Sequence, residues 1–296
     1  TNEAFRANSA SVGFTPVNFE NEIIGTPGIS LLHRYNDNVN YYFSYNRGVR
    51  NPTAEELNGF FEHPPSSSTT SSFIIDANPN LEEETSDSFE LGVQSEINKN
   101  TFSISFYNNF YDGFIELIKQ PSPGVVDLYS NDNVGKVEIY GYELSWGKRE
   151  WEIIENYPPV DLGFSLSWAE GKKVDNDMPL NTIEPWKANS YLYWESLEED
   201  LGLRLGLTYR ASKEIDQIDH SNGPKLPIND SLVLDLSSWH KLSENWRISG
   251  GINNVTNEKF FLWSGAGRGG GHSSSSVEEK NTQPGINGFI QIEATF

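Results

Sequence analysis

The sequence predicts an all-β chain that folds as an antiparallel transmembrane β-barrel. Three observations support this prediction. Apolar and polar residues alternate within segments along most of the chain. The connections between these segments are alternately short and long. No apolar run approaches the roughly 20 residues that a membrane-crossing helix needs. The composition agrees, because 36% hydrophobic residues are few for a large buried core, while 13% of the residues are aromatic.

The alternation is clearest in LGLRLGLTYR, residues 201–210. Leucines and a tyrosine occupy one face of this predicted strand, and Arg204 and Arg210 lie on the other. In a soluble sandwich the apolar face would point to a shared core, whereas in a membrane barrel it would meet lipid. The alternation alone does not choose between these two folds.

The lengths of the connections favour the barrel. Apart from a medium link at 148–159, tiny links such as NDN and NKN alternate with long excursions such as 119–136 and 211–230, so the strands would be joined by turns on one rim and by loops on the other. About 11 to 12 strands are expected, since a short segment near 114–118 is assigned as a continuation of the fourth. The eleven principal strands are expected at 29–35, 39–48, 88–97, 101–111, 137–147, 160–169, 188–196, 201–210, 231–240, 246–254 and 287–296.

The charge and the missing motifs exclude several classes of function. A formal net charge of −21 argues against nucleic acid as a partner, because nucleic-acid binding needs basic patches. The chain has no cysteine, which excludes disulfides and thiol catalysis. It contains neither a nucleophile elbow nor a zinc-protease motif nor a phosphate-binding loop, so an enzyme is not expected. The opening TNEAFRANSA is not typical of a signal peptide and indicates a piece of a longer protein.

Two short boxes carry a resemblance to a known family. Residues 49–52 (VRNP) follow one predicted strand, and Asn78, Pro79, Asn80 and Leu81 precede the next. With VEIYGYELSW, INNVTNEKFF and the final GFIQIEATF, this pattern resembles the TonB-dependent outer-membrane receptors over about residues 27–296. It is most similar to their haem and haemoglobin branch, which carries an FRAP-type box and an NPNL box. The second box matches fully, while in the first only Arg50 and Pro52 match.

The resemblance implies the C-terminal half of a 22-stranded barrel in a bacterial outer membrane, without the N-terminal plug. The whole chain, 1–296, would be one barrel domain, with 1–28 belonging to a preceding extracellular loop. It also implies contact with outer-membrane lipid and, through the missing plug, with the TonB-ExbB-ExbD complex. Long extracellular loops are expected at about 49–87, 119–136, 170–187, 211–230 and 255–286.

His63 is the candidate site residue that the resemblance singles out. Receptors of the haem branch are expected to present an axial histidine between the two boxes, and His63 lies there in FFEHPP. Neutral imidazole is an ordinary ligand of haem iron, and Phe60 and Phe61 would lie on the porphyrin face. His272, in GRGGGHSSSS, is a second candidate for handing haem onward, although a flexible linker with no such role is the favoured interpretation of this stretch.

The remaining candidates have plainer roles. His220 has Asp216 and Asp219 nearby and is expected to be solvated. His33 and His240 lie on predicted strands, where a structural role is expected. Arg50 and Asn78 are expected to anchor the loop to the barrel, and the lumen arginines 204 and 210 are expected to face the plug or haem propionates.

The expected function is therefore active uptake of haem, from haemoglobin or from another haem-carrier protein. One alternative keeps the receptor and changes its cargo to a ferric siderophore, transferrin-type iron or another large nutrient. A further alternative, of a different class, is a passive outer-membrane pore or a barrel enzyme.

Overall fold

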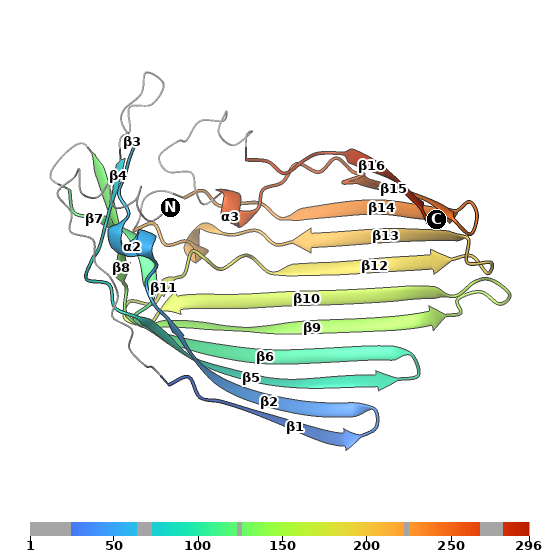
Figure 1. Cartoon of the computed structure of the whole chain (residues 1–296), viewed down its shortest axis with the longest axis horizontal. Helices are drawn as coiled ribbons and strands as arrows, with labels where there is room; N and C mark the ends of the chain where they lie inside the picture. Colours follow the sequence, from blue (N-terminus) through green and yellow to red (C-terminus); the bar gives the residue numbers. More distant parts are fainter. Residues whose placement is uncertain (1–24, 64–72, 123–125, 222–224, 267–280, 296) are drawn as a thin grey trace.

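The computed structural model describes residues 25–63, 73–122, 126–221, 225–266 and 281–295. Its main element is one antiparallel sheet in which neighbouring strands follow each other in chain order (Figure 1). The two-residue strand β11 (Met178–Pro179) adds to β10. The strands of this sheet, in order, are β1 (Gly28–Asn36), β2 (Val39–Arg50), β5 (Glu84–Ile97), β6 (Asn100–Asp112), β9 (Val137–Trp151), β10 (Val160–Lys173), β12 (Lys187–Glu195), β13 (Leu201–Arg210), β14 (Ser231–Lys241), β15 (Trp246–Asn253) and β16 (Asn287–Ala294).

Each of the eleven predicted strands is present, and the all-β antiparallel fold is confirmed. One detail of the prediction is wrong. Residues 114–118 do not extend the fourth strand, because Gly113 adopts φ of +68 and ends β6. A glycine reaches this conformation without the steric cost that other residues meet. The chain then starts β7 (Ile115–Gln120), which belongs to a second sheet.

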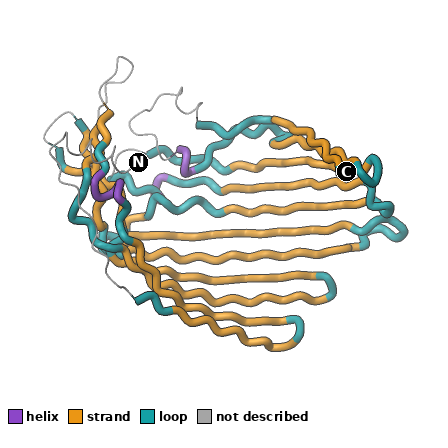
Figure 2. The backbone as a smooth tube through the Cα atoms, viewed as in Figure 1, coloured by secondary structure: helices purple, strands orange, loops and turns teal. Residues whose placement is uncertain are grey.

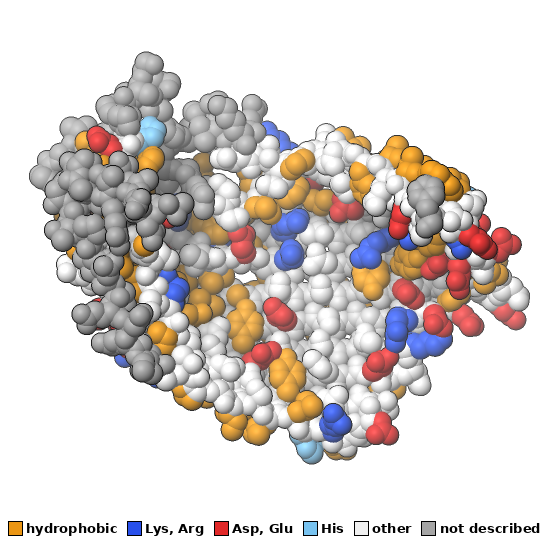
Figure 3. Space-filling model, viewed as in Figure 1, with side chains coloured by type: hydrophobic (Ala, Val, Ile, Leu, Met, Phe, Trp, Pro, Cys, Tyr) orange, Lys and Arg blue, Asp and Glu red, His pale blue; other side chains and the backbone are white. Residues whose placement is uncertain are grey.

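The large sheet has one apolar face and one polar face. Leu203, Leu205 and Leu207 of β13 are each between 37% and 41% exposed, and no second sheet covers them in the described part of the chain. This excludes the sandwich reading, in which these leucines would be buried. On the opposite face, Figure 3 shows mostly uncharged polar side chains and backbone over the middle of the sheet, with charged side chains gathered toward one end.

The second sheet is built from two of the long connections. Its order is β3 (Phe61–His63), β4 (Phe73–Asp76), β8 (Asp127–Asn133) and β7, and β4 runs parallel to β8. A short helix, α2 (Ala54–Asn58), precedes it and begins with a capping box between Thr53 and Glu56. Figure 1 places this sheet beyond one end of the large sheet.

The two ends of the large sheet differ. Tight turns such as residues 37–38 and 98–99 join strands at one end, which we call the turn end, and the long connections leave from the other, the loop end (Figure 2). Two further short helices lie in the long connections, η1 (Ile215–Gln217) and α3 (Trp263–Ala266). No helix in the described ranges is long and apolar enough to cross a membrane.

Small cores at the loop end hold the connections together. One joins Leu57 of α2, Leu81 and Ile115 of β7, and a second joins Ile218, Ile228 and Trp263. Each cluster brings together residues from connections that are far apart in sequence. The apolar burial that fixes the loops is therefore separate from the exposed apolar face of the large sheet.

Candidate functional site

Arg50 ties the start of the first long connection to the large sheet. Its guanidinium donates to both carboxylate oxygens of Glu56 in α2 at 3.1 Å and to Glu84 of β5 at 3.1 Å. Glu84 also accepts a hydrogen bond from the backbone N–H of Ile115 at 3.0 Å. One arginine therefore links α2, β5 and β7, which is the anchoring role that the sequence predicts for it.

The pKa of Glu56 reflects this arrangement. Burial alone would raise the pKa of the carboxyl, but the hydrogen bonds from the backbone of Thr53 and from Arg50 outweigh burial and hold it below the ordinary value of 4.5. The stabilising contribution of Glu56 is present above that ordinary value. It is lost as the pH falls through the lower pKa of the folded state.

The second box fastens the other side of the same connection. The Asn78 side-chain amide donates to the carbonyl of Asn131 in β8 at 2.9 Å, and its oxygen accepts from the N–H of Asn80 at 3.0 Å. Leu81 enters the small core, and Pro52 of the first box is buried. Pro79 and Asn80 complete the turn between these contacts. The two boxes thus flank β3 and β4 of the second sheet along the chain.

His63 is the last residue of β3, and its ring packs on an aromatic neighbour from the adjacent strand. The imidazole and the ring of Phe73 are stacked, with centroids 5.2 Å apart and planes 4° apart. Its Nδ1 atom is buried and has no hydrogen-bond partner among the described atoms. Because this nitrogen is buried, an iron ion arriving from outside would have to bind the other ring nitrogen, Nε2.

An aromatic row extends from His63 across the second sheet. Phe61 lies 5.8 Å from Phe73, and Phe73 lies 6.2 Å from Tyr129 of β8, measured between ring centroids. Phe61 is exposed, as is its neighbour Phe60. Because residues two apart on a strand share a face, Phe61 and His63 present their side chains on the same side of β3.

The sequence pointed to Phe60, Phe61 and His63 but missed Phe73 and Tyr129. The signal for Phe73 was available in FIID, whose alternation is that of a short strand. Nothing local indicated that this strand pairs with β8, which is more than 50 residues away. His272 lies outside the described residues.

The other histidines lie elsewhere. His220 is exposed, beside the buried Asp219. His33 stacks on Tyr41 with ring centroids 6.3 Å apart, and the Nδ1 atom of His240 lies 2.9 Å from the carbonyl oxygen of Asp200. Both lie on strands of the large sheet near its turn end, consistent with structural roles.

A buried ionic cluster that the sequence did not indicate connects three further segments at the loop end. Lys173, at the end of β10, lies 2.7 Å from Glu116 of β7 and 3.0 Å from Asp219. The carboxylate of Asp219 also accepts from Ser221 N–H, and its backbone pairs with Asn181. Burial would raise the pKa of Asp219, but hydrogen bonds from Ser221 and Lys173 outweigh burial and hold it below the usual value.

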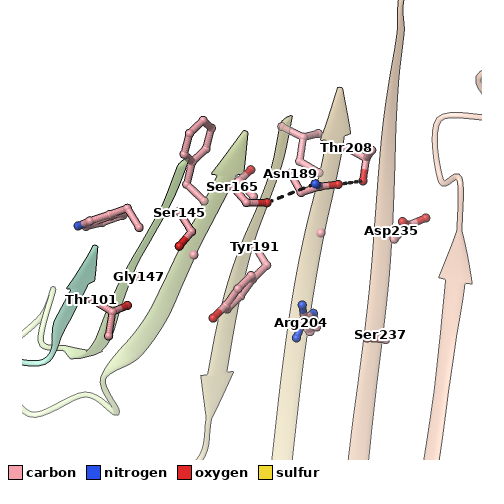
Figure 4. Close-up of a pocket in the computed structure, with 16 residues that line it drawn as sticks. Thr101, Ser145, Gly147, Ser165, Asn189, Tyr191, Arg204, Thr208, Asp235 and Ser237 are labelled. Atoms are coloured by element: carbon pink, nitrogen blue, oxygen red, sulfur yellow. Dashed lines mark hydrogen bonds between the residues drawn. The ribbon is translucent and has the colours of Figure 1, made fainter. Parts of the chain in front are cut away.

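The polar face of the large sheet carries a hollow of about 590 Å³ (Figure 4). Gly206 leaves open space in its lining, the ring of Tyr191 packs against Gly163, and Arg204 lies over the ring of Tyr191 at 4.4 Å. Asn189 joins Ser165 and Thr208 through hydrogen bonds of 3.3 and 3.2 Å.

Comparison with known proteins agrees with this architecture. The sequence matches the family described as TonB dependent receptor-like, beta-barrel, over residues 4–255. Two solved structures superpose on most of the chain. Because their sequence identities are below 25%, they show similarity of fold alone. The copper transporter OprC has a TM-score of 0.70 at 19% identity and covers 91% of this chain and 39% of its own. The siderophore receptor PirA from Pseudomonas aeruginosa has a TM-score of 0.63 at 16% identity and covers 92% of this chain and 42% of its own.

Two curated relatives are named for haemoglobin. The hemoglobin and hemoglobin-haptoglobin-binding protein A of Haemophilus influenzae is 23% identical, in an alignment that covers 85% of this chain and 24% of that protein. The hemoglobin-haptoglobin utilization protein B of Neisseria meningitidis is 24% identical, in an alignment that covers 80% of this chain and 32% of that protein. The chain therefore spans about a quarter to a third of these relatives.

The large antiparallel sheet, its exposed apolar face and its short turns alternating with long loops are those of an outer-membrane barrel. The family match covers most of the sequence, and the solved structures match the sheet to roughly 40% of their own chains. This chain belongs to the TonB-dependent receptor family of outer-membrane proteins, and it corresponds to the C-terminal part of the receptor barrel.

Proposed function

We propose that the receptor containing this chain takes up haem and that His63 binds the haem iron. In this proposal the loop end faces the outside of the cell and the turn end faces the periplasm. The observation that carries the proposal is the position of His63. It stands at the end of β3 and packs on an aromatic row, in a connection that the two boxes flank.

The geometry suits an axial ligand. An imidazole that ligates haem iron stands roughly perpendicular to the porphyrin, so Phe73, stacked parallel to His63, would meet the porphyrin by its edge. Phe61, tilted by 39° from Phe73 and exposed, is free to cover part of the porphyrin face. Burying the porphyrin against these rings would supply apolar contact, and the histidine would set the position of the iron.

The relatives' names add independent support, because they refer to haemoglobin in two bacterial species. We infer haemoglobin or another haem-carrier protein as the source of the cargo. The exposed second sheet and the long loops would meet this carrier. The barrel contains no nucleotide motif, so the energy would come from the TonB-ExbB-ExbD complex acting on a plug.

A ferric siderophore is the second candidate cargo, and one observation favours it. The first box departs from the haem-branch pattern, since Val49 and Asn51 stand where Phe and Ala are usual. The anchoring contacts use Arg50 alone of that box, so they would serve a receptor for either cargo.

Titration of the purified, full-length receptor with haemin separates the two cargoes. We expect a saturable shift of the Soret band and no displacement of haemin by an excess of ferric enterobactin. In an iron-limited strain, the receptor should support growth on haemin. A receptor that leaves the haemin spectrum unchanged, and that supports growth on the ferric siderophore instead, would refute haem as the cargo.

A further inference from the structure

The connection between β9 and β10, residues 152–159, differs from the other connections at the turn end. It is longer than the turns at 37–38, 98–99, 196–200 and 242–245, and it projects beyond them in Figure 1. Together with Trp151 at the end of β9, we call this segment the β9–β10 hook. Its tip is closed by a hydrogen bond from the N–H of Tyr157 to the carbonyl of Ile154 at 3.2 Å.

The hook exposes large apolar side chains to an unusual degree. Trp151 is 44% exposed, Ile153 56%, Ile154 59% and Tyr157 66%. Clustered apolar exposure of this kind marks a surface that meets a membrane or another protein. The polar turns at 37–38 and 98–99 carry no such cluster, and the turns at 196–200 and 242–245 each expose a single leucine, Leu197 and Leu242.

Strand register places the base of the hook on the lipid-facing side. Trp151 pairs with Val160, and Val160 pairs on its other side with Trp194. Val160 is two residues from Leu162 on β10, so both lie on the apolar face of the sheet. Cross-strand partners share a face, which puts Trp151 and Trp194 there as well. The hook therefore begins as a direct continuation of the apolar face.

Polar contacts hold the base of the hook in place. The Glu150 N–H donates to Asp161 at 2.7 Å, Arg149 pairs with Glu96 at 2.6 Å, and Glu150 pairs with Lys99. Glu150 adopts φ of +49 where the pairing of β9 with β10 shifts register, and Trp151 still pairs with Val160 beyond this bulge. The exposed apolar tip is thus presented from a defined base.

We propose that the β9–β10 hook inserts its apolar tip into the interfacial region of the periplasmic leaflet of the outer membrane. The partner that the tip contacts is the lipid surface, because the hook continues the face of the sheet that already meets lipid. Trp and Tyr are the residues that favour this zone, since their rings are apolar at one end and polar at the other. Glu152 and Glu155 would point to water from the same turn. The periplasmic location rests on the orientation given under the proposed function.

The absence of cysteine from this chain permits a direct test. Ile154→Cys would be introduced into the full receptor, after replacement of any cysteine outside residues 1–296, and labelled with an environment-sensitive NBD fluorophore. The labelled receptor would be reconstituted into vesicles of phosphatidylethanolamine and phosphatidylglycerol. Glu244→Cys, in the shorter turn at 242–245 where Leu242 is the one large apolar residue, is the matched control, and Tyr157→Cys is a second reporter within the hook. Heat-modifiable migration on a gel checks that each variant is folded.

At residues 154 and 157 we expect NBD emission at shorter wavelength than at 244. Lipids with a spin label near the headgroup should quench the two hook positions about twofold more than the control. Equal accessibility of all three positions to aqueous iodide would overturn the proposal. So would protection from iodide without quenching by the spin-labelled lipid, which would indicate a protein contact. Haemin binding does not enter this measurement, so its outcome is independent of the cargo.

Discussion

Replacing Lys173 with methionine is expected to detach several loops from one another at the loop end. Lys173 lies between Glu116 and Asp219, and the three side chains are only 10%, 13% and 2% exposed. Removing the cation leaves two buried carboxylates without their partner, a change that costs about 3–5 kcal/mol when a buried ion pair is broken on one side. We expect backbone amides in 113–136 and 211–230 to lose protection from hydrogen exchange, while the strands of the large sheet keep theirs.

The triple variant Lys173→Met, Glu116→Gln, Asp219→Asn is the matched control, because it removes the cation and both charges together. It should recover part of the lost protection, since neutral amides are less costly to bury than unpaired carboxylates. If Lys173→Met alone leaves exchange in both segments unchanged, the cluster does not hold the loops.

Replacing Arg50 with alanine is expected to release α2 and the second sheet from the barrel. Glu84 is 10% exposed and would keep only the N–H of Ile115, and Glu56 would lose two hydrogen bonds. Arg50 itself is partly exposed, so water can replace some of the hydrogen bonds that it donates. We expect a loss of about 2–3 kcal/mol of local stability. Hydrogen exchange should rise in 54–58, 73–76 and 115–120.

Arg50→Lys tests whether charge or geometry matters. Lysine keeps the charge, but its single ammonium group cannot donate to Glu56 and Glu84 in the fixed forked geometry of a guanidinium. The increase in hydrogen exchange should therefore lie between that of the wild type and that of Arg50→Ala. Exchange equal to that of the wild type in Arg50→Ala would contradict the anchoring role. The wild-type connection should itself loosen only at a pH below the ordinary value of 4.5, as Glu56 takes up a proton, because the pKa of Glu56 in the folded state lies below that value.

Local sequence pattern was enough to predict the large sheet. Each strand carries its own alternation, and neighbouring strands are joined by turns that the sequence marks, such as NDN and NKN. Pairing in this sheet follows chain order, so no long-range choice had to be made. Connection lengths then distinguished a lipid-facing surface from a packed one.

The second sheet and the ionic cluster were beyond such reasoning. β4 is only four residues long and pairs in parallel with β8 from another connection, an arrangement that no local signal specifies. Lys173 and Asp219 are 46 residues apart, and each alone resembles an ordinary charged loop residue. His63 could be named because a box stands on each side of it, whereas Phe73 beside it depends on that non-local pairing.

Resonance Raman spectroscopy of the haem-loaded, full-length receptor tests the role of His63 most directly. In the reduced wild type we predict an iron–imidazole stretching band that Ala at position 63 abolishes. We also predict at least about a tenfold weaker haem affinity, which corresponds to 1.4 kcal/mol. His220→Ala, at an exposed histidine of another loop, should change neither. An unaltered band and affinity in His63→Ala would contradict the account.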